Sequence, residues 1–144
     1  MKRTIFLLLL ILSFFTLFAK GRKKNADNLP LLNTKWGVIE IFQNTVSYSA
    51  DTAFIIFTDN YTLSGNLGCN LFFGEFNYGK KTIKIDYSGS TKMLCQDMHI
   101  ETLFAKAIKD DITHYYIEKN NLYLLNKNKV VCKFRAIKTV ENNY

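Results

Sequence analysis

Three cysteines and two histidines are the side chains in this sequence best suited to nucleophilic or metal chemistry. A zinc site needs closely spaced ligand pairs, and Cys69, Cys95 and Cys132 form no Cys-x-x-Cys pair. A thiolate nucleophile needs a partnering base, for which His99 and His114 are the candidates. We expect both histidines to be solvated or capping residues. The sequence therefore predicts no catalytic residue, no metal site and no cofactor.

Gly65, Gly68 and Gly74 are the next residues whose spacing could serve chemistry, because glycine-rich loops bind phosphates. No Lys-Ser or Lys-Thr pair directly follows them, and their spacing matches neither the P-loop nor the dinucleotide-binding pattern. Turns and bulges between strands explain these glycines better. We therefore expect a protein that binds rather than catalyses.

Cys69 and Cys95 have two interpretations that the sequence leaves open. They could form a disulfide, which an exported location permits, or remain two buried thiols. Closing the loop between them would stabilise the fold by about 3–4 kcal/mol in the chain-entropy account of disulfides. Cys132 is left over, and we expect it in the core of the last strand.

Residues 1–19 have the pattern of an export signal. Lys2 and Arg3 precede an almost wholly apolar run over residues 5–19. As a helix this run would rise about 22 Å, which is shorter than the hydrocarbon core of a bilayer. We predict cleavage after Ala19 and export to the periplasm, the envelope or the medium. A basic cluster at positions 20 and 22–24 follows the run, so an uncleaved membrane anchor is the alternative.

The formal net charge of +7 belongs mainly to this N-terminal segment. From residue 25 onward, 13 Lys and Arg stand against 12 Asp and Glu. A nucleic-acid module would carry its charge on the folded domain. We therefore expect no nucleic-acid partner, and membrane contact only through the N-terminal segment if it stays uncleaved.

Apolar alternation predicts strands over most of the remaining chain. Helical spacing appears once in the folded region, at Ile100, Leu103, Phe104, Ala107 and Ile108. With Asp97 as its cap, this pattern predicts a helix over about residues 98–110. One helix cannot connect a many-stranded parallel sheet. The predicted fold class is therefore α+β, with a mostly antiparallel twisted sheet or open β-barrel and one covering helix.

Two details of the strands bear on packing and on partners. In the first strand, Ile39 and Ile41 are predicted to share one face. Adjacent aromatics elsewhere must point to opposite faces of a strand. Core packing explains most of them, but an exposed aromatic patch could recognise a partner. The candidates for such a patch are Phe72, Phe73, Tyr115 and Tyr116.

Two cysteine motifs carry a family resemblance. A Gly-Cys-Asn with a downstream glycine is followed by Thr-x-Met-x-Cys and then by a glutamate in the predicted helix. The residues of this pattern are Trp36, Gly65, Gly68, Cys69, Asn70, Gly74, Thr91, Met93, Cys95 and Glu101. Their order resembles the META domain, the HslJ-like heat-shock family. The resemblance covers a domain at residues 33–138, between a polar connector at 20–32 and a polar tail at 139–144.

The resemblance implies a small α+β fold found in bacterial envelope and secreted proteins, often linked with stress or drug tolerance. It implies no established catalytic activity or cofactor. The sequence departs from many relatives by carrying Leu94 where they have alanine and by lacking a lipoprotein cysteine. We expect an exported, non-enzymatic module that binds an unknown protein or cell-wall partner during stress. The alternative is a carrier that holds a small apolar ligand inside the barrel.

Overall fold

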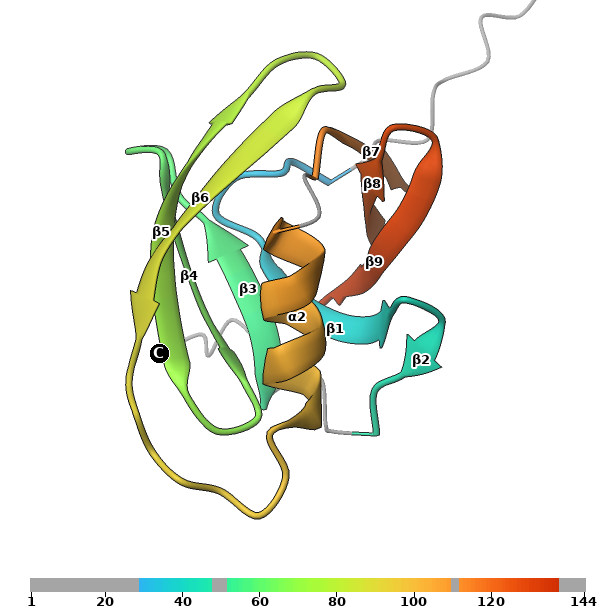
Figure 1. Ribbon diagram of the computed structural model, residues 1–144. Helices are drawn as coiled ribbons and strands as arrows, with labels where there is room; N and C mark the ends of the chain where they lie inside the picture. The colour runs from blue at the N-terminus through green and yellow to red at the C-terminus, as the bar shows by residue number, and fades with distance from the viewer. Residues whose placement is uncertain (1–28, 48–51, 110–111, 138–144) are drawn as a thin grey trace, which may run out of the picture.

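A computed structural model describes residues 29–47, 52–109 and 112–137 of the protein (Figure 1). The predicted targeting segment at residues 1–19 lies outside the described residues, as does the polar tail at residues 139–144. Only the last four residues of the predicted connector, 29–32, are described.

The domain is a single antiparallel sheet curled into a half-barrel around one helix, so the predicted α+β class is confirmed (Figure 1). The strands run in the order β6-β5-β4-β3-β1-β9-β8-β7, and the short β2 pairs with β1. Their bounds are β1 Lys35–Ile41, β2 Asn44–Thr45, β3 Ala53–Phe57, β4 Thr62–Leu67, β5 Leu71–Tyr78, β6 Ile83–Ser90, β7 His114–Glu118, β8 Asn121–Asn126 and β9 Lys129–Ala136.

The two edge strands of the sheet, β6 and β7, meet at one end of the half-barrel. The Ile83 amide donates to the Thr113 carbonyl at 3.0 Å, and the Tyr115 amide donates to the Lys81 carbonyl at 2.9 Å. Thr82 and His114 form the bridge between these bonds. Because the edges meet only over this short stretch, the rest of the opening is left for the helix.

The helix α2 spans His99–Lys109, close to the predicted range, and occupies the open side of the curled sheet (Figure 1). It buries Ile100, Phe104 and Ala107, which belong to the predicted apolar stripe. Asp97 accepts a hydrogen bond from the His99 amide at 2.9 Å. This bond satisfies one of the free amides of the first turn, as expected for an N-cap.

Large aromatic side chains fill the inside of the half-barrel. Trp36, Phe57, Phe76, Phe104 and Phe134 are all almost completely buried. The Trp36 indole N–H donates to the Leu31 carbonyl at 3.0 Å. Leu31 is itself 5 % exposed, so the packed domain begins within the segment that the sequence assigned to the connector. The Leu-Leu pair that follows Pro30 is too short an apolar pattern to show in the sequence where the packed domain begins.

The predicted pairing of Ile39 with Ile41 on one face is wrong. The register between β1 and β9 shifts between Val38 and Glu40, so one residue of β1 has no opposite partner. This bulge puts Val38 and Ile41 in the core and leaves Ile39 only half-buried. Because side chains alternate along a strand, one extra residue reverses the faces beyond it.

Candidate functional site

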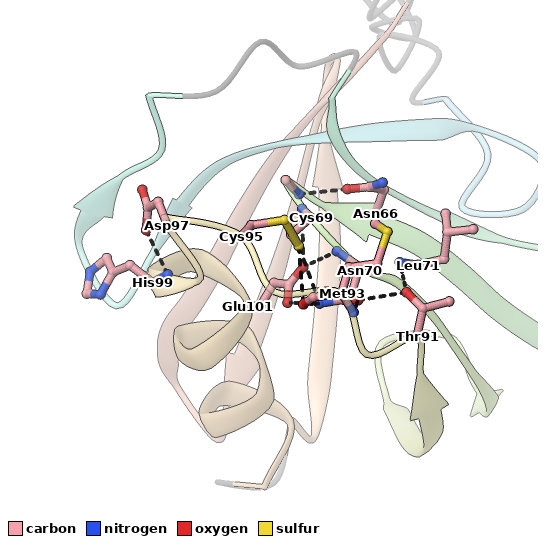
Figure 2. Close-up of a disulfide and its surroundings, with 11 residues drawn as sticks. Asn66, Cys69, Asn70, Leu71, Thr91, Met93, Cys95, Asp97, His99 and Glu101 are labelled. Carbon is pink, nitrogen blue, oxygen red and sulfur yellow. Dashed lines mark hydrogen bonds between the residues drawn. A yellow bond between two sulfur atoms is a disulfide. The ribbon is translucent and has the colours of Figure 1, made fainter.

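Six of the motif residues meet where the turn between β4 and β5 faces the loop between β6 and α2, namely Cys69, Asn70, Thr91, Met93, Cys95 and Glu101 (Figure 2). We call this loop, residues 91–98, the latch loop. A disulfide joins Cys69 in the turn to Cys95 in the latch loop, with the Cα atoms 6.1 Å apart. The structure thus decides between the two interpretations left open for these cysteines. Cys69 is buried, whereas residues 91–97 of the latch loop are exposed.

Asn70 fastens the latch loop a second time, through its side-chain amide (Figure 2). Asn70 Oδ1 accepts from the Met93 amide at 2.7 Å and from Thr91 Oγ1 at 2.8 Å. Asn70 Nδ2 donates to the Met93 carbonyl at 3.2 Å and to Glu101 Oε2 at 3.0 Å. Asn70 is only 4 % exposed, and these four bonds use both donors and both lone pairs of its amide.

Glu101 ties the first turn of α2 to the same place. Its Oε1 accepts from the Cys69 amide at 3.2 Å and also from the Asn70 amide. Its Oε2 accepts from the Asn70 side chain. A carboxylate is also favoured in the first turn of a helix by the helix dipole. Glu101 therefore holds the strand turn, the latch loop and the helix in one arrangement.

Thr91 extends the pairing of β5 and β6 into the latch loop. The Thr91 amide donates to the Leu71 carbonyl at 2.9 Å, and Thr91 Oγ1 accepts from the Leu71 amide at 3.1 Å. The hydroxyl of Thr91 also donates to Asn70, so its single proton and one of its lone pairs are engaged. The latch loop is thus held at Thr91, at Met93 and at Cys95.

The motif glycines allow the strands and the turn to take this shape. Gly68 has a φ of 114°, which strains any other residue, and its amide donates to Asn66 Oδ1 at 2.7 Å. A Cβ added at Gly65 would lie 2.2 Å from the Phe54 carbonyl oxygen. One added at Gly74 would lie 2.4 Å from the Asp86 carbonyl oxygen. These positions therefore serve close packing and a turn rather than phosphate binding.

The motif brings structural groups together and leaves the candidate nucleophile and bases apart. Cys69 and Cys95 are joined in the disulfide, so neither has a free thiol. Cys132 is fully buried in β9, and burial raises the pKa of its thiol well above the usual range. His99 and His114 are exposed, one in the first turn of α2 and the other at the start of β7. Within the described part of the chain, no three His, Cys, Asp or Glu side chains are grouped as a metal site.

The hollow beside the motif is too small for an organic ligand. It measures about 30 Å³ and is bordered by Asn70, Phe72 and Glu101, among others. Ligand sites are usually ten or more times larger. Hollows of about 450 and 610 Å³ lie along β6, one against α2 and one beside Tyr78 and Thr113. Among the hollows bordered by described residues, those of substrate size do not include the motif residues.

The latch loop presents apolar side chains to solvent. Leu94 is 98 % exposed and Met93 is 53 % exposed. Leu71 and Phe73, on the outer face of β5, are each 55 % exposed, and the Phe73 ring lies over Gly89 of β6. Sequence reasoning missed Leu71 and Leu94 as surface residues. Their neighbours gave no clear signal, because Phe72 beside Leu71 was itself a surface candidate and Met93 beside Leu94 is also exposed.

Of the four candidate partner-binding aromatics, Phe72 is excluded, and of the pair expected on opposite faces Phe73 is the exposed one. Phe72 is 4 % exposed, and its ring packs against Phe104 at 5.2 Å between centroids. Phe73 points outward, because neighbours on a strand face opposite sides. Tyr115 is half-buried and donates its hydroxyl to the Gly79 carbonyl at 3.1 Å. Tyr116 is 40 % exposed and lies on a different part of the sheet from Phe73.

The fold and the motif together define a class of small α+β domain, in which a half-barrel is completed by one helix and a disulfide-fastened loop. The sequence model of the META domain matches residues 29–138, which is most of the chain. The chain therefore belongs to the META domain family. Comparison with curated proteins and with solved structures gave no significant match. Over the described residues, no helix reaches the length and apolar character needed to cross a bilayer.

Proposed function

We propose that this META domain is an exported, non-enzymatic binding module, and that the latch loop is part of its contact with a protein or cell-wall partner. The observation that carries the proposal is Leu94, a 98 % exposed leucine on a loop held at three points. A rigid loop loses little conformational entropy on binding. The association with stress rests on the family resemblance alone.

Export is supported by two independent features. The disulfide is consistent with an oxidising compartment, since such bonds are rare in reducing cytosol. The sequence of residues 1–19 has the order of charges and apolar residues that export signals share. The intact mass of the non-reduced protein from its own cells tests both. We expect loss of the first nineteen residues and of the two hydrogens of one disulfide, whereas a full-length chain would overturn cleaved export.

Binding through the latch loop is supported by the neighbouring surface. Leu71 is bonded to Thr91 and so lies beside the base of the loop. Phe73 follows on the same face of β5, opposite Ser64 of β4 and Gly89 of β6. These side chains carry no charge. Lys92 and Glu75 are exposed nearby and would lie toward the rim of such a contact. Exposed apolar groups that lie together are typical of protein contacts.

The second candidate function, an apolar-ligand carrier, receives less support. Fully buried side chains such as Trp36, Phe104 and Phe134 occupy the inside of the half-barrel. The hollows of about 610 and 450 Å³ lie along β6, and a third of about 520 Å³ is bordered by Asn33, Ile56 and Ile137, among others. A ligand inside would have to displace packed aromatic rings, each of which stabilises the fold by several kcal/mol.

A photo-crosslinking amino acid at position 94 tests the proposed contact in the native envelope. We expect one dominant adduct from position 94 and the same adduct from position 73. Lys127, in the exposed turn between β8 and β9, provides a matched control position. A Leu94→Asp variant should compete poorly with the wild type for the captured partner.

Three outcomes would count against the proposal. The adduct could form equally from position 127, which would show unspecific capture. Leu94→Asp could compete as well as the wild type, which would move the contact elsewhere. A small molecule that co-purifies with the unmodified protein, without any protein or cell-wall adduct, would favour the carrier.

A further inference from the structure

The positive charge of the domain is concentrated in its last three strands. Residues 112–137 contain five Lys or Arg and a single acidic residue, Glu118. Residues 29–111 contain seven Lys and nine Asp or Glu. Since β7, β8 and β9 lie together at one end of the strand order, this difference in sequence becomes a basic wall of the half-barrel (Figure 1).

Register places aromatic and basic side chains in one row on the outer face of this wall. Tyr116 of β7 is opposite Tyr123 of β8, which is opposite Lys133 of β9. Their outward direction follows from alternation, because Leu122, Leu124, Cys132 and Phe134 are the buried neighbours on these strands. In the next row, Arg135 lies opposite Asn121. We call Tyr116, Tyr123, Lys133 and Arg135 the basic aromatic face.

The two tyrosines form a rigid platform. Their rings are stacked, with centroids 4.4 Å apart and an angle of 11° between the planes. Lys133 Nζ lies 5.8 Å from the centre of the Tyr123 ring. Tyr116, at the outer end of the row, remains 40 % exposed. The stacked pair thus offers an accessible aromatic surface with the Lys133 ammonium beside it.

We propose that the basic aromatic face binds a segment of an anionic polysaccharide. This site goes beyond the proposed function, because it lies on β7–β9 and not on the latch loop or β5. Lysine and arginine supply charge-assisted hydrogen bonds to carboxylate, sulfate or phosphate substituents. Exposed tyrosine combines a large apolar surface with a hydroxyl, and so matches the apolar face and the hydroxyls of a sugar ring.

The arrangement fits a glycan better than a nucleic acid. Tyr116 and Tyr123 are stacked on each other, so no base can enter between them, and single-stranded nucleic acids are held by stacking successive bases. Glu118 lies on the same wall, and Glu40 of β1 is opposite Lys133. These carboxylates would repel a chain that carries a phosphate at every residue. A polysaccharide with spaced anionic groups tolerates them.

Fluorescence anisotropy with labelled oligosaccharides tests the inference on the full chain. The probes are a partly methyl-esterified oligogalacturonate, whose remaining carboxylates are spaced along the chain, and its fully methyl-esterified form, which has the same sugars without the charge. We expect at least tenfold tighter binding of the charged probe, with affinity falling as salt is raised. The double variant Lys133→Gln, Arg135→Gln should weaken this binding about tenfold.

Two further variants separate site binding from general charge. Lys80→Gln, Lys81→Gln removes the same charge at the turn between β5 and β6, and should leave affinity within about twofold. Tyr116→Ala should weaken binding several-fold without changing its salt dependence. Equal losses in both double variants would reduce the effect to net charge and overturn the site.

Two other kinds of ligand, a single-stranded oligonucleotide and anionic lipid vesicles, would overturn the inference if they bound in place of the oligosaccharide. Tighter binding of a single-stranded oligonucleotide than of oligogalacturonate, with the same variant dependence, would assign the face to nucleic acid instead. Binding of anionic lipid vesicles without binding of the oligosaccharide would assign it to a membrane surface. Circular dichroism and thermal unfolding verify that each variant is folded. None of these results depends on Leu94, so they leave the proposal for the latch loop untouched.

Discussion

Asn70 and Glu101 are two polar side chains that hold the turn between β4 and β5, the latch loop and the first turn of α2 together. Each is placed so that every strong donor or acceptor facing inward has a partner. Buried polar groups that are fully satisfied fix one geometry, because any shift leaves a group unpaired. At the scale of single residues, the motif therefore acts as a fastening.

Asn70→Ala should be strongly destabilising. It leaves the Met93 amide, the Met93 carbonyl and Glu101 Oε2 without their partner. We expect the free energy of unfolding to fall by about 2–4 kcal/mol, as measured by urea denaturation. Asn77→Ala, at an exposed position of the same strand, is the control and should change it by less than about 0.5 kcal/mol. Similar losses in both variants would contradict a specific role for Asn70.

Glu101→Gln should also lower the stability of the fold, although glutamine has the same shape as glutamate. One amide oxygen can still accept from the Cys69 and Asn70 backbones. The amide nitrogen would then face Asn70 Nδ2, which is itself a donor. We expect a loss of about 1–3 kcal/mol by the same denaturation assay. Glu75→Gln, at an exposed position, is the control that removes the same charge. An unchanged free energy of unfolding in Glu101→Gln would show that the bond from Asn70 to Oε2 is not needed.

The latch loop is an element without regular structure that is nevertheless fixed in place. It has one covalent link at Cys95 and hydrogen bonds at Thr91 and Met93. Cross-linking acts mainly on the unfolded chain, whereas the Asn70 and Glu101 bonds act in the folded one. Removing the disulfide and removing these hydrogen bonds should therefore have different effects on the latch loop.

Removing the disulfide by Cys69→Ser, Cys95→Ser should lower stability without releasing the base of the loop. For a separation of 26 residues the chain-entropy account gives about 3.5 kcal/mol. In the folded variant, the Met93 amide should stay protected from hydrogen exchange, because Asn70 Oδ1 still accepts its bond. Exchange at Met93 as fast as in an unfolded peptide would show that the disulfide alone holds the loop.

Across the whole molecule, the half-barrel depends on a filled interior that includes one free thiol. Cys132 lies in the centre of β9, which pairs with both β1 and β8. Burial raises the pKa of its thiol, since a thiolate there would be desolvated. The folded protein therefore keeps this proton at a pH where the unfolded chain releases it.

The thiol should make stability fall at alkaline pH. Its pKa in the unfolded chain is about 8.5, so the unfolded state binds fewer protons above that pH and gains free energy relative to the fold. Wild type should lose about 2 kcal/mol more than Cys132→Ala between pH 7 and pH 10. Urea denaturation across this range, with refolding verified at each pH, measures the difference. Parallel curves for the two proteins would contradict the burial of an ionisable thiol.

The sequence by itself determined the class of fold, the helix and the family. Apolar alternation and one amphipathic stretch are local patterns, and α2 falls within a residue of its predicted ends because its stripe and its Asp97 cap are both local. The order of the cysteine motifs gave the META resemblance, which the match over residues 29–138 bears out. Compartment, partner and the absence of catalysis remain predictions.

Only the tertiary structure decided which residues of the motif touch one another and which side chains are left outside. Asn70 and Glu101 are 31 positions apart, so no local pattern shows their hydrogen bond. The bulge in β1 separated Ile39 from Ile41, which is buried, through pairing with β9, which comes from the far end of the chain. Leu94 and the row from Tyr116 to Lys133 became surfaces for the same reason, because burial depends on strands that meet only in the folded molecule.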